Sequence, residues 1–326
     1  MRRENIPMEF GLAIPTRGPL ADRASIEAIA ARAEALGCSW LAVPDHLIVP
    51  RAIDSRYPYS DTGAFPGSES GECLEQFTLL AFLAAITTRA RLLTSVTVVP
   101  HRGAIETAKL VSTIDNLSGG RFTFGVGAGW MEEEFKAIQA PPFASRGKVT
   151  DEIIEACRVL WRDDAPAHDG EFFRFSNVTF LPKPVQRPGV PVWVGGESNA
   201  ALRRTVRLGD TWFPIHTNPR HPLNTAGRFR GGVGRLHALA EGHGRDPSSI
   251  GLAVWSNTYD ETRPEQRVDG EHHLLTGGAD ALVDDIGTLA EIGVEQVLLN
   301  FLRADLERSL ESMQRFADEV MTKAPV

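Results

Sequence analysis

Short apolar segments alternate along this chain with longer segments in which apolar residues recur at helical spacing. The first apolar segment covers residues 8–14, and a helical pattern follows over 22–36. Gly37 then stands where a helix C-terminal cap is expected, and the next apolar segment covers 39–43. Because strands of a parallel sheet are buried on both faces, they read as continuous apolar runs, so the pattern predicts β/α units.

The same alternation continues to the end of the chain. Further strands are predicted at 91–99, 122–126, 191–196, 211–215, 250–255 and 296–300, and further helices at 75–87, 105–117, 131–138, 149–161, 200–208, 228–241, 279–292 and 305–321. There are eight such units, and the amino-acid composition does not change between them. This favours an α/β fold, a (β/α)8 TIM barrel that spans 1–326 as a single domain. Two segments interrupt the repeat: a lid-like loop at 51–72, and an insertion at 165–190 in which 171–175 and 178–181 predict a small hairpin.

Composition and charge narrow the range of partners. The chain of 326 residues has a net charge of -8 and scattered arginines, so no basic face is expected to bind nucleic acid. No long apolar run occurs, and Arg2 and Arg3 are not followed by an apolar segment, so we expect a cytoplasmic protein without membrane contact. Cys38, Cys73 and Cys157 are too few and too far apart for a disulfide framework or a zinc site, and no metal is expected.

In a parallel barrel the functional groups lie on the loops that follow the strands. Asp45 and His46 follow the second strand, where His46 can exchange a proton near neutral pH and Asp45 can fix the orientation of its ring. The alternative is that Asp45 only orients the loop and His46 is merely exposed. His101 follows the third strand beside Arg102; this pair predicts anion or ring-edge binding, or else belongs to a solvated loop.

Three glycines, Gly125, Gly127 and Gly129, follow the fourth strand, but Trp130 occupies the last glycine position of the dinucleotide-binding pattern. The segment is therefore not a Rossmann motif. Its glycines instead allow close approach of the backbone to a flat ligand or a phosphate. The three acids at 132–134 open the next helix, and for at least two of them we expect the role of complementing its N-terminus.

Residues 195–199, with the sequence GGESN, form the best candidate anion site in the chain. Bare backbone N–H groups, the Ser198 hydroxyl and a helix N-terminus converge there, which predicts a phosphate site. The alternative is that Ser198 is an ordinary N-cap and that the glycines serve only the turn. Gly277 and Gly278 form a similar but poorer site before a later helix.

At these residues the chain resembles the luciferase-like monooxygenase superfamily, and within it the branch of oxidoreductases that use coenzyme F420, a deazaflavin. The resemblance covers nearly the whole chain and rests on the order of several short segments: LSGGR at 117–121, GVGAGWMEEE at 125–134, FASRG at 143–147, PKP at 182–184, VGGES at 194–198 and GDTW at 209–212. It implies that a deazaflavin or flavin ring lies over the strand ends, with its phosphate held by the loop after the fifth strand.

The resemblance also assigns individual residues. It implies a non-proline cis peptide in the third strand, between Ser95 and Val96 or an adjacent pair, and it implies that His46 acts near the reacting carbon as general acid or base. Where sugar-phosphate dehydrogenases of this branch carry an acid after the glycines, this chain has Trp130, which favours a more apolar substrate pocket. The residues expected at the cofactor are Asp45, Ser95, Val96, Thr97, Gly127, Gly195, Gly196, Glu197, Ser198 and Asn199. Those expected at the substrate are Tyr57, Phe65, His101 and Trp130.

Four hypotheses for the function follow. The first is hydride transfer between coenzyme F420 and a small organic substrate; the second is a two-component monooxygenase that uses reduced FMN on the same barrel. A metal-dependent barrel hydrolase commonly carries a His-x-His pair after its first strand, whereas this strand ends in residues 14–17, IPTR. A non-catalytic cofactor carrier would keep the phosphate loop without turnover. The resemblance also implies a homodimer.

Overall fold

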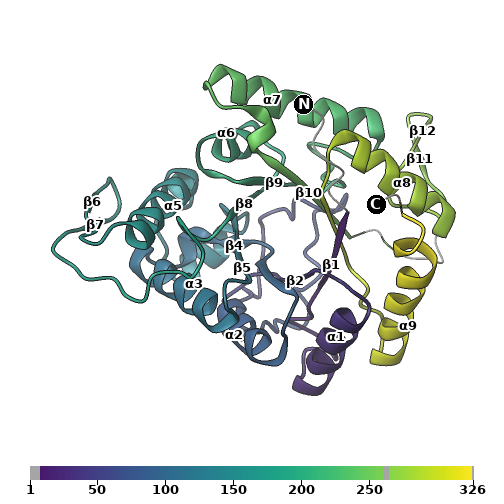
Figure 1. Ribbon diagram of the computed structural model, residues 1–326, viewed down its shortest axis with the longest axis horizontal. Coiled ribbons are helices and arrows are strands. Elements are labelled where there is room, and N and C mark those ends of the chain that lie inside the picture. Colours follow the sequence, from purple (N-terminus) through teal and green to yellow (C-terminus); the bar gives the residue numbers. More distant parts are fainter. Residues whose placement is uncertain (1–7, 258, 260–263, 325–326) are drawn as a thin grey trace.

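The computed structural model describes residues 8–257, 259 and 264–324. Its central sheet is a closed barrel of parallel strands, shown with its surrounding helices in Figure 1. The strands are ordered β3-β2-β1-β13-β10-β9-β8-β5-β4, and β3 also pairs with β5, which closes the ring. Because β3 and β4 are two parts of one barrel strand, eight strands surround the core, and the predicted (β/α)8 fold is confirmed.

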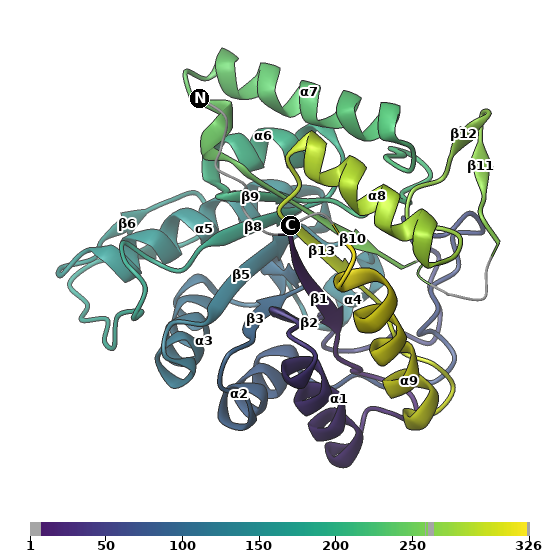
Figure 2. The same ribbon diagram turned by 45° about the vertical axis from the view of Figure 1, so that its right-hand side comes forward.

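The observed bounds lie within a few residues of the predicted ones, apart from the exceptions given below. The barrel strands are β1 (Glu9–Ala13), β2 (Trp40–Val43), β3 (Arg91–Thr94), β4 (Thr97–Val98), β5 (Phe122–Gly127), β8 (Val192–Gly195), β9 (Thr211–Phe213), β10 (Gly251–Ser256) and β13 (Gln296–Leu299). The helices are α1 (Arg23–Ala35), α2 (Gln76–Ile86), α3 (Ala104–Ser118), α4 (Glu132–Ala137), α5 (Arg146–Arg162), α6 (Asn199–Leu208), α7 (Ala226–Gly242), α8 (Ala279–Ile292) and α9 (Leu306–Phe316). Apart from the short α4, these helices ring the sheet, as Figure 2 shows from a second angle.

Alternating strand residues fill two separate layers of core. In β2, Leu41 and Val43 pack outward against the helices, whereas Trp40 and Ala42 point into the barrel. The Trp40 ring meets that of Trp193 from β8, with 4.5 Å between ring centroids, so aromatic side chains fill the interior. The barrel is therefore a packed core rather than a pore, and space for a ligand exists only beyond the strand ends.

The third barrel strand is interrupted where the resemblance predicts it. The structure has a non-proline cis peptide between Ser95 and Val96, and β3 and β4 lie on either side of it. Neighbouring β5 accommodates this bulge with glycines: a Cβ at Gly125 would lie 1.9 Å from the Thr94 carbonyl oxygen, and a Cβ at Gly127 would lie 2.6 Å from the Val96 side chain. The glycines that the sequence singles out in this strand therefore serve close packing between strands as well as the cavity above them.

Two predicted elements differ from the structure, and one observed element was not predicted. The inserted hairpin pairs β6 (His168–Asp169) with β7 (Arg174–Phe175), and the predicted strand at 178–181 is not a strand, because residues 178–179 are exposed and Phe180 packs into the core without pairing to a neighbouring strand. The predicted helix at 149–161 begins earlier, at Arg146 of α5. A second hairpin, β11 (Arg267–Val268) with β12 (Glu271–His272), follows β10 and was not predicted. Among the described residues no helix is long and apolar enough to span a bilayer.

Candidate active site

A cavity of about 910 Å³ opens at the C-terminal ends of the barrel strands. Its wall is built from residues directly after most of these strands, including Thr16 after β1, Pro44 after β2, Ala128 after β5 and Asn300 after β13. The lid-like loop adds residues 55–59 and Phe65 to the same wall. The barrel thus brings together, over one opening, side chains that are far apart in sequence.

Most of the residues predicted for the site line this cavity. They are Asp45, His46, Tyr57, Phe65, Ser95, Val96, Gly127, Trp130, Gly195, Gly196, Glu197 and Ser198. Three predicted residues do not line it. Thr97 points away and donates through its hydroxyl to Gln76 at 2.8 Å, Asn199 is exposed at the start of α6 without lining the cavity, and the His101 side chain is buried behind the wall.

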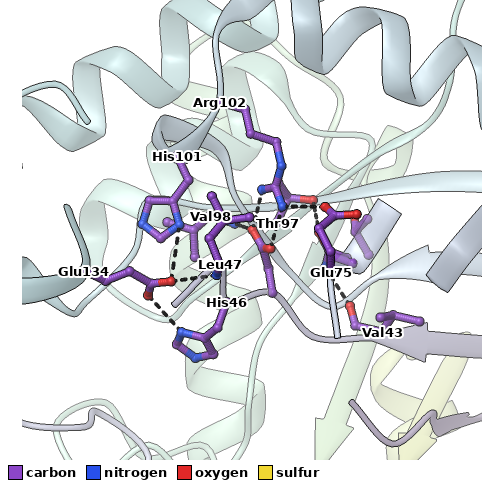
Figure 3. A network of polar contacts seen from close by, with 12 residues as sticks. Val43, His46, Leu47, Glu75, Thr97, Val98, His101, Arg102 and Glu134 are labelled. Carbon is purple, nitrogen blue, oxygen red and sulfur yellow. Dashed lines mark hydrogen bonds and ion pairs between the residues drawn. The ribbon is translucent and has the colours of Figure 1, made fainter. Parts of the chain in front are cut away.

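The chemistry of the site is concentrated around Glu134, a buried residue of α4 (Figure 3). Its Oε2 lies 2.8 Å from Nδ1 of His46, and its Oε1 accepts the Leu47 backbone N–H at 2.8 Å. His101 approaches from the other side, with Nδ1 3.8 Å from Oε1. The carboxylate therefore sits between two imidazoles, and it is Glu134 rather than the predicted Asp45 that orients the His46 ring.

Both pKa shifts in this cluster have clear causes. Burial alone would raise the pKa of Glu134, but the hydrogen bond from His46, the charges of both histidines and the Leu47 N–H together hold it below its usual value. Glu134 is therefore ionised and can only accept, so His46 Nδ1 carries the proton. Burial lowers the pKa of His101 despite the nearby carboxylates, and neither of its ring nitrogens has a hydrogen-bond partner among the described residues.

The tautomer of His46 decides what it can do. With Nδ1–H committed to Glu134, Nε2 is the nitrogen left for a ligand, and it has no partner in the described part of the chain. The ring packs 4.9 Å from that of Phe65, which holds it at the cavity wall. His46 is thus placed to accept or donate a proton at a molecule in the cavity.

Asp45 has a different set of contacts. Its carboxylate forms a bidentate pair with Arg102 at 2.8 and 3.0 Å and accepts the Val98 N–H at 2.9 Å. Arg102 also reaches Glu75 at 2.8 Å, and Gln76 donates to the Val43 carbonyl oxygen at 2.7 Å. These bonds, visible at the right of Figure 3, tie β4 to β2 and hold the bulged strand in place under the cavity.

The predicted anion site at the start of α6 has the geometry of a cradle. Gly196 has a φ of +101°, a conformation that favours glycine, and it turns the chain from β8 into the helix. Ser198 caps α6 by accepting the Ala201 N–H at 3.2 Å, as its alternative interpretation predicts, and it also lines the cavity. With the Ala201 N–H bound to this cap, the Asn199 and Ala200 N–H groups are the ones left without an intrahelical acceptor, and these two could bind an anion.

Glu197 is a buried carboxyl within this loop. Oε1 accepts the Ile215 N–H at 2.7 Å and Oε2 accepts from the Asn218 amide at 2.5 Å. Burial nevertheless raises its pKa to about 7, against the effect of these hydrogen bonds. Burial thus favours the protonated, uncharged form of this carboxyl, which lessens its repulsion of an anion bound nearby.

Sequence reasoning missed Glu134 and Arg17. Glu134 stands among three successive acids, and its buried position on α4 separates it from Glu132, which is exposed and pairs with Lys136 at 2.9 Å. The one available signal was Phe135 beside it, which marks the inward face of the helix. Arg17 follows β1 and lines the cavity next to Phe65, but nothing in its local sequence indicates this.

A parallel α/β barrel with a ligand-sized cavity over its strand ends, a bulged third strand and a glycine turn into α6 after β8 has the architecture of a ligand-binding barrel. The model of one such family, the luciferase-like monooxygenases, matches residues 8–317, and the chain belongs to that family. It is an oxidoreductase family, and the proteins similar to this chain include one named as FMNH2-dependent and one named as F420-dependent.

Sequence relatives agree with this assignment. An uncharacterised protein of Mycobacterium tuberculosis is 34% identical over 215 residues, covering 65% of this chain and 73% of its own. The pyrimidine monooxygenase RutA of Cronobacter sakazakii is 29% identical over 263 residues, covering 76% and 75%. An FMNH2-dependent dimethylsulfone monooxygenase of Pseudomonas putida is 34% identical over 141 residues, covering 43% and 39%.

Solved structures show the same fold at lower identity. Monooxygenase RslO1 from Streptomyces bottropensis superimposes with a TM-score of 0.74 at 23% identity, covering 97% of this chain and 99% of that one. An F420-dependent secondary alcohol dehydrogenase, in complex with an F420–acetone adduct, gives 0.72 at 16% identity, covering 96% and 98%. Both likenesses show the barrel fold.

Proposed function

We propose that this protein transfers hydride between coenzyme F420 and a small organic substrate, with His46 as the proton donor or acceptor. The observation that carries the proposal is the Glu134–His46 pair, which leaves Nε2 facing a molecule in the cavity. Hydride transfer to or from a carbon next to oxygen requires a proton to move at that oxygen, and this pair can move it. The deazaflavin ring would supply the hydride chemistry itself.

The residues present fit such a cofactor. Gly195, Gly196 and Ser198 would hold its phosphate, since a side chain at Gly196 would meet Ala201 at 3.2 Å and close the cradle. Val96 and Gly127 would form the surface on which a flat ring lies. The two residues are so closely packed that a Cβ at Gly127 could not be accommodated next to Val96. Asp45, locked by Arg102, would keep this surface in position.

The alternative is a two-component monooxygenase that uses reduced FMN. It is favoured by the names of two relatives, the dimethylsulfone and pyrimidine monooxygenases. It requires the same phosphate cradle but a cavity that protects an oxygenated flavin from water, for which the aromatic wall of Tyr57, Phe65 and Trp130 is also suited.

Equilibrium titration of the purified protein with F420, FMN and reduced FMN, followed by cofactor fluorescence or calorimetry, tests the proposal. We expect F420 to bind at least about tenfold more tightly than either FMN form. Tighter binding of reduced FMN, with oxygen-dependent turnover, would support the monooxygenase. Absence of binding by all three would reject both functions.

A further inference from the structure

Five arginines of the described residues line the cavity: Arg17, Arg56, Arg146, Arg204 and Arg220. On the α5–α6 side, beside the phosphate cradle, Arg204 pairs with Asp151, and Arg146 donates to the backbone oxygens of Gly129 and Phe143 at 3.2 and 3.0 Å. On the other side stands Arg17, which follows β1. In the ring of eight barrel strands β1 and β8 are four strands apart in either direction, so Arg17 and the phosphate cradle face each other across the opening.

Arg17 has no charge partner in the part of the chain that the structure describes. It forms no hydrogen bond or ion pair with any residue that the structure describes, and its guanidinium carbon lies 4.9 Å from the centroid of the Phe65 ring. The lid-like loop closes directly over it, because a Cβ at Gly67 would come within 2.0 Å of an Arg17 nitrogen. A guanidinium held this way at a cavity wall is a ready site for a carboxylate, which it can bind through two parallel hydrogen bonds.

Aromatic rings surround the space between Arg17 and His46. The Tyr57 ring lies 5.2 Å from Trp130 and 5.5 Å from Phe65, and Phe65 lies 5.4 Å from Trp130. The Tyr57 hydroxyl has no partner among the described residues; burial raises its pKa, and the charge of Arg17 partly opposes this, which shows that the two groups are close. A ligand with a flat apolar ring and a polar group at one end would fit this space. Its ring would pack against the aromatic side chains, and its polar group would face Arg17.

We propose that the substrate of this site is an aromatic carboxylate, with its ring against Trp130 and Tyr57 beside His46 and its carboxylate on Arg17. This inference rests on the proposed function for the identity of the reaction, but not for binding itself. A neutral aromatic molecule would leave the Arg17 charge partly desolvated and unpaired, which disfavours it. A cofactor phosphate in the cradle after β8 would leave Arg17 free for this second anion.

The test is calorimetric binding of three probes to the whole protein: 2-naphthoate, its neutral analogue 2-naphthalenemethanol, and acetate. We expect 2-naphthoate to bind more tightly than the other two. Arg17→Met should weaken 2-naphthoate roughly 10- to 100-fold and leave the alcohol unchanged, Arg17→Lys should recover part of the loss, and Trp130→Leu should weaken both aromatic probes. Arg220→Met is the control, because Arg220 also lines the cavity but lies exposed on the loop after β9.

Several results would overturn the inference. Equal binding of 2-naphthoate and its alcohol, an unchanged affinity in Arg17→Met, or a loss in Arg220→Met instead would each do so. Circular dichroism of each variant shows that it is folded, and Arg17→Lys keeps the test informative if Arg17→Met is not. Because the cofactor titrations are separate, failure of F420 and FMN to bind while the Arg17-dependent preference persists would reject the proposed function alone.

Discussion

A single carboxylate, Glu134, connects the groups at the candidate active site. It is almost completely buried, accepts from the backbone after β2, and fixes the tautomer of His46. Its two neighbours in sequence face other surroundings: Glu132 pairs with Lys136, and Glu133 accepts the Asp54 and Ser55 N–H groups of the lid-like loop at 2.9 and 3.0 Å. Three identical residues therefore have three different roles, decided by the face of α4 on which each lies.

His46→Ala should lower kcat and leave cofactor affinity nearly unchanged. A general acid or base contributes on the order of 100- to 10,000-fold, so the loss should fall in that range and appear in kcat rather than in KM. Steady-state kinetics on a turned-over substrate, with a cofactor titration in parallel, measures both. Near-normal kcat in this variant would move the proton transfer elsewhere, and His101 would be the next imidazole to replace.

Glu134→Gln tests the positioning of that histidine. The amide retains a hydrogen-bond acceptor but loses the charge, so kcat should fall on the order of tenfold or more while KM and cofactor affinity stay close to those of the unmodified protein. Glu132→Gln is the matched control on the same helix and should leave kcat unchanged. Equal effects of the two substitutions would assign Glu134 a structural role only.

Glu197→Gln should change how stability depends on pH. The folded-state pKa of Glu197 is raised from 4.5 to about 7, so its contribution is fully present below about pH 4.5 and is lost as pH rises through 7. The stability of the unmodified protein, relative to the variant, should therefore fall by up to about 3 kcal/mol between pH 4.5 and 7.5. Urea unfolding across this range measures the difference, and a difference that is independent of pH would contradict the prediction.

At the scale of elements, the backbone conformation of the turn from β8 into α6 is expected to control cofactor binding. Gly196→Leu should weaken cofactor binding at least about tenfold, because the side chain would fill the cradle and the φ of +101° disfavours it. Ser198→Ala should mainly remove the helix cap, at a cost of about 1 kcal/mol in the free energy of unfolding.

Gly293 provides a matched control for Gly196. It has the same φ of +101°, ends α8, and has its nearest neighbour for an added Cβ at 3.7 Å, away from the cavity wall. Gly293→Leu should therefore be destabilised by backbone strain but bind the cofactor normally. If it loses as much cofactor affinity as Gly196→Leu, strain rather than blocking of the cradle explains both.

At the scale of the whole molecule, the resemblance predicts a homodimer, and the surface offers a place for it. Exposed apolar side chains gather along α3 and the segment beside it: Leu117 and Leu181 are each 64% exposed and Val185 is 50% exposed. Asn116 donates to the Lys183 carbonyl oxygen at 2.8 Å, so this segment runs along α3. Clusters of exposed apolar residues of this kind mark association surfaces.

Light scattering after size exclusion should give the mass of a dimer for the unmodified protein. Leu117→Glu combined with Leu181→Glu should shift the mass to that of one chain, because burying two charges at an interface is unfavourable. A single-chain mass for the unmodified protein would contradict the homodimer. A dimer that survives both substitutions would place the interface elsewhere.

The amino-acid sequence by itself determined the eight β/α units, because each strand reads as an apolar run and each helix as a repeat of apolar positions. It also predicted the glycine turn and the Ser198 cap at the start of α6, since these residues are neighbours along the chain, and the phosphate site proposed there stays a prediction. The cis peptide at Ser95 and the aromatic wall came from the resemblance.

Only the tertiary structure decided which acid forms the hydrogen bond with His46. Sequence proximity favoured Asp45, but that carboxylate is bound to Arg102, and the partner of His46 comes from α4, 88 residues away. The same holds for Arg17 and Phe65, which belong to a strand end and a loop that meet only over the closed barrel. Local patterns determine secondary structure because its hydrogen bonds are local, whereas the pairing of charges across the opening depends on where closure of the ring places each strand end.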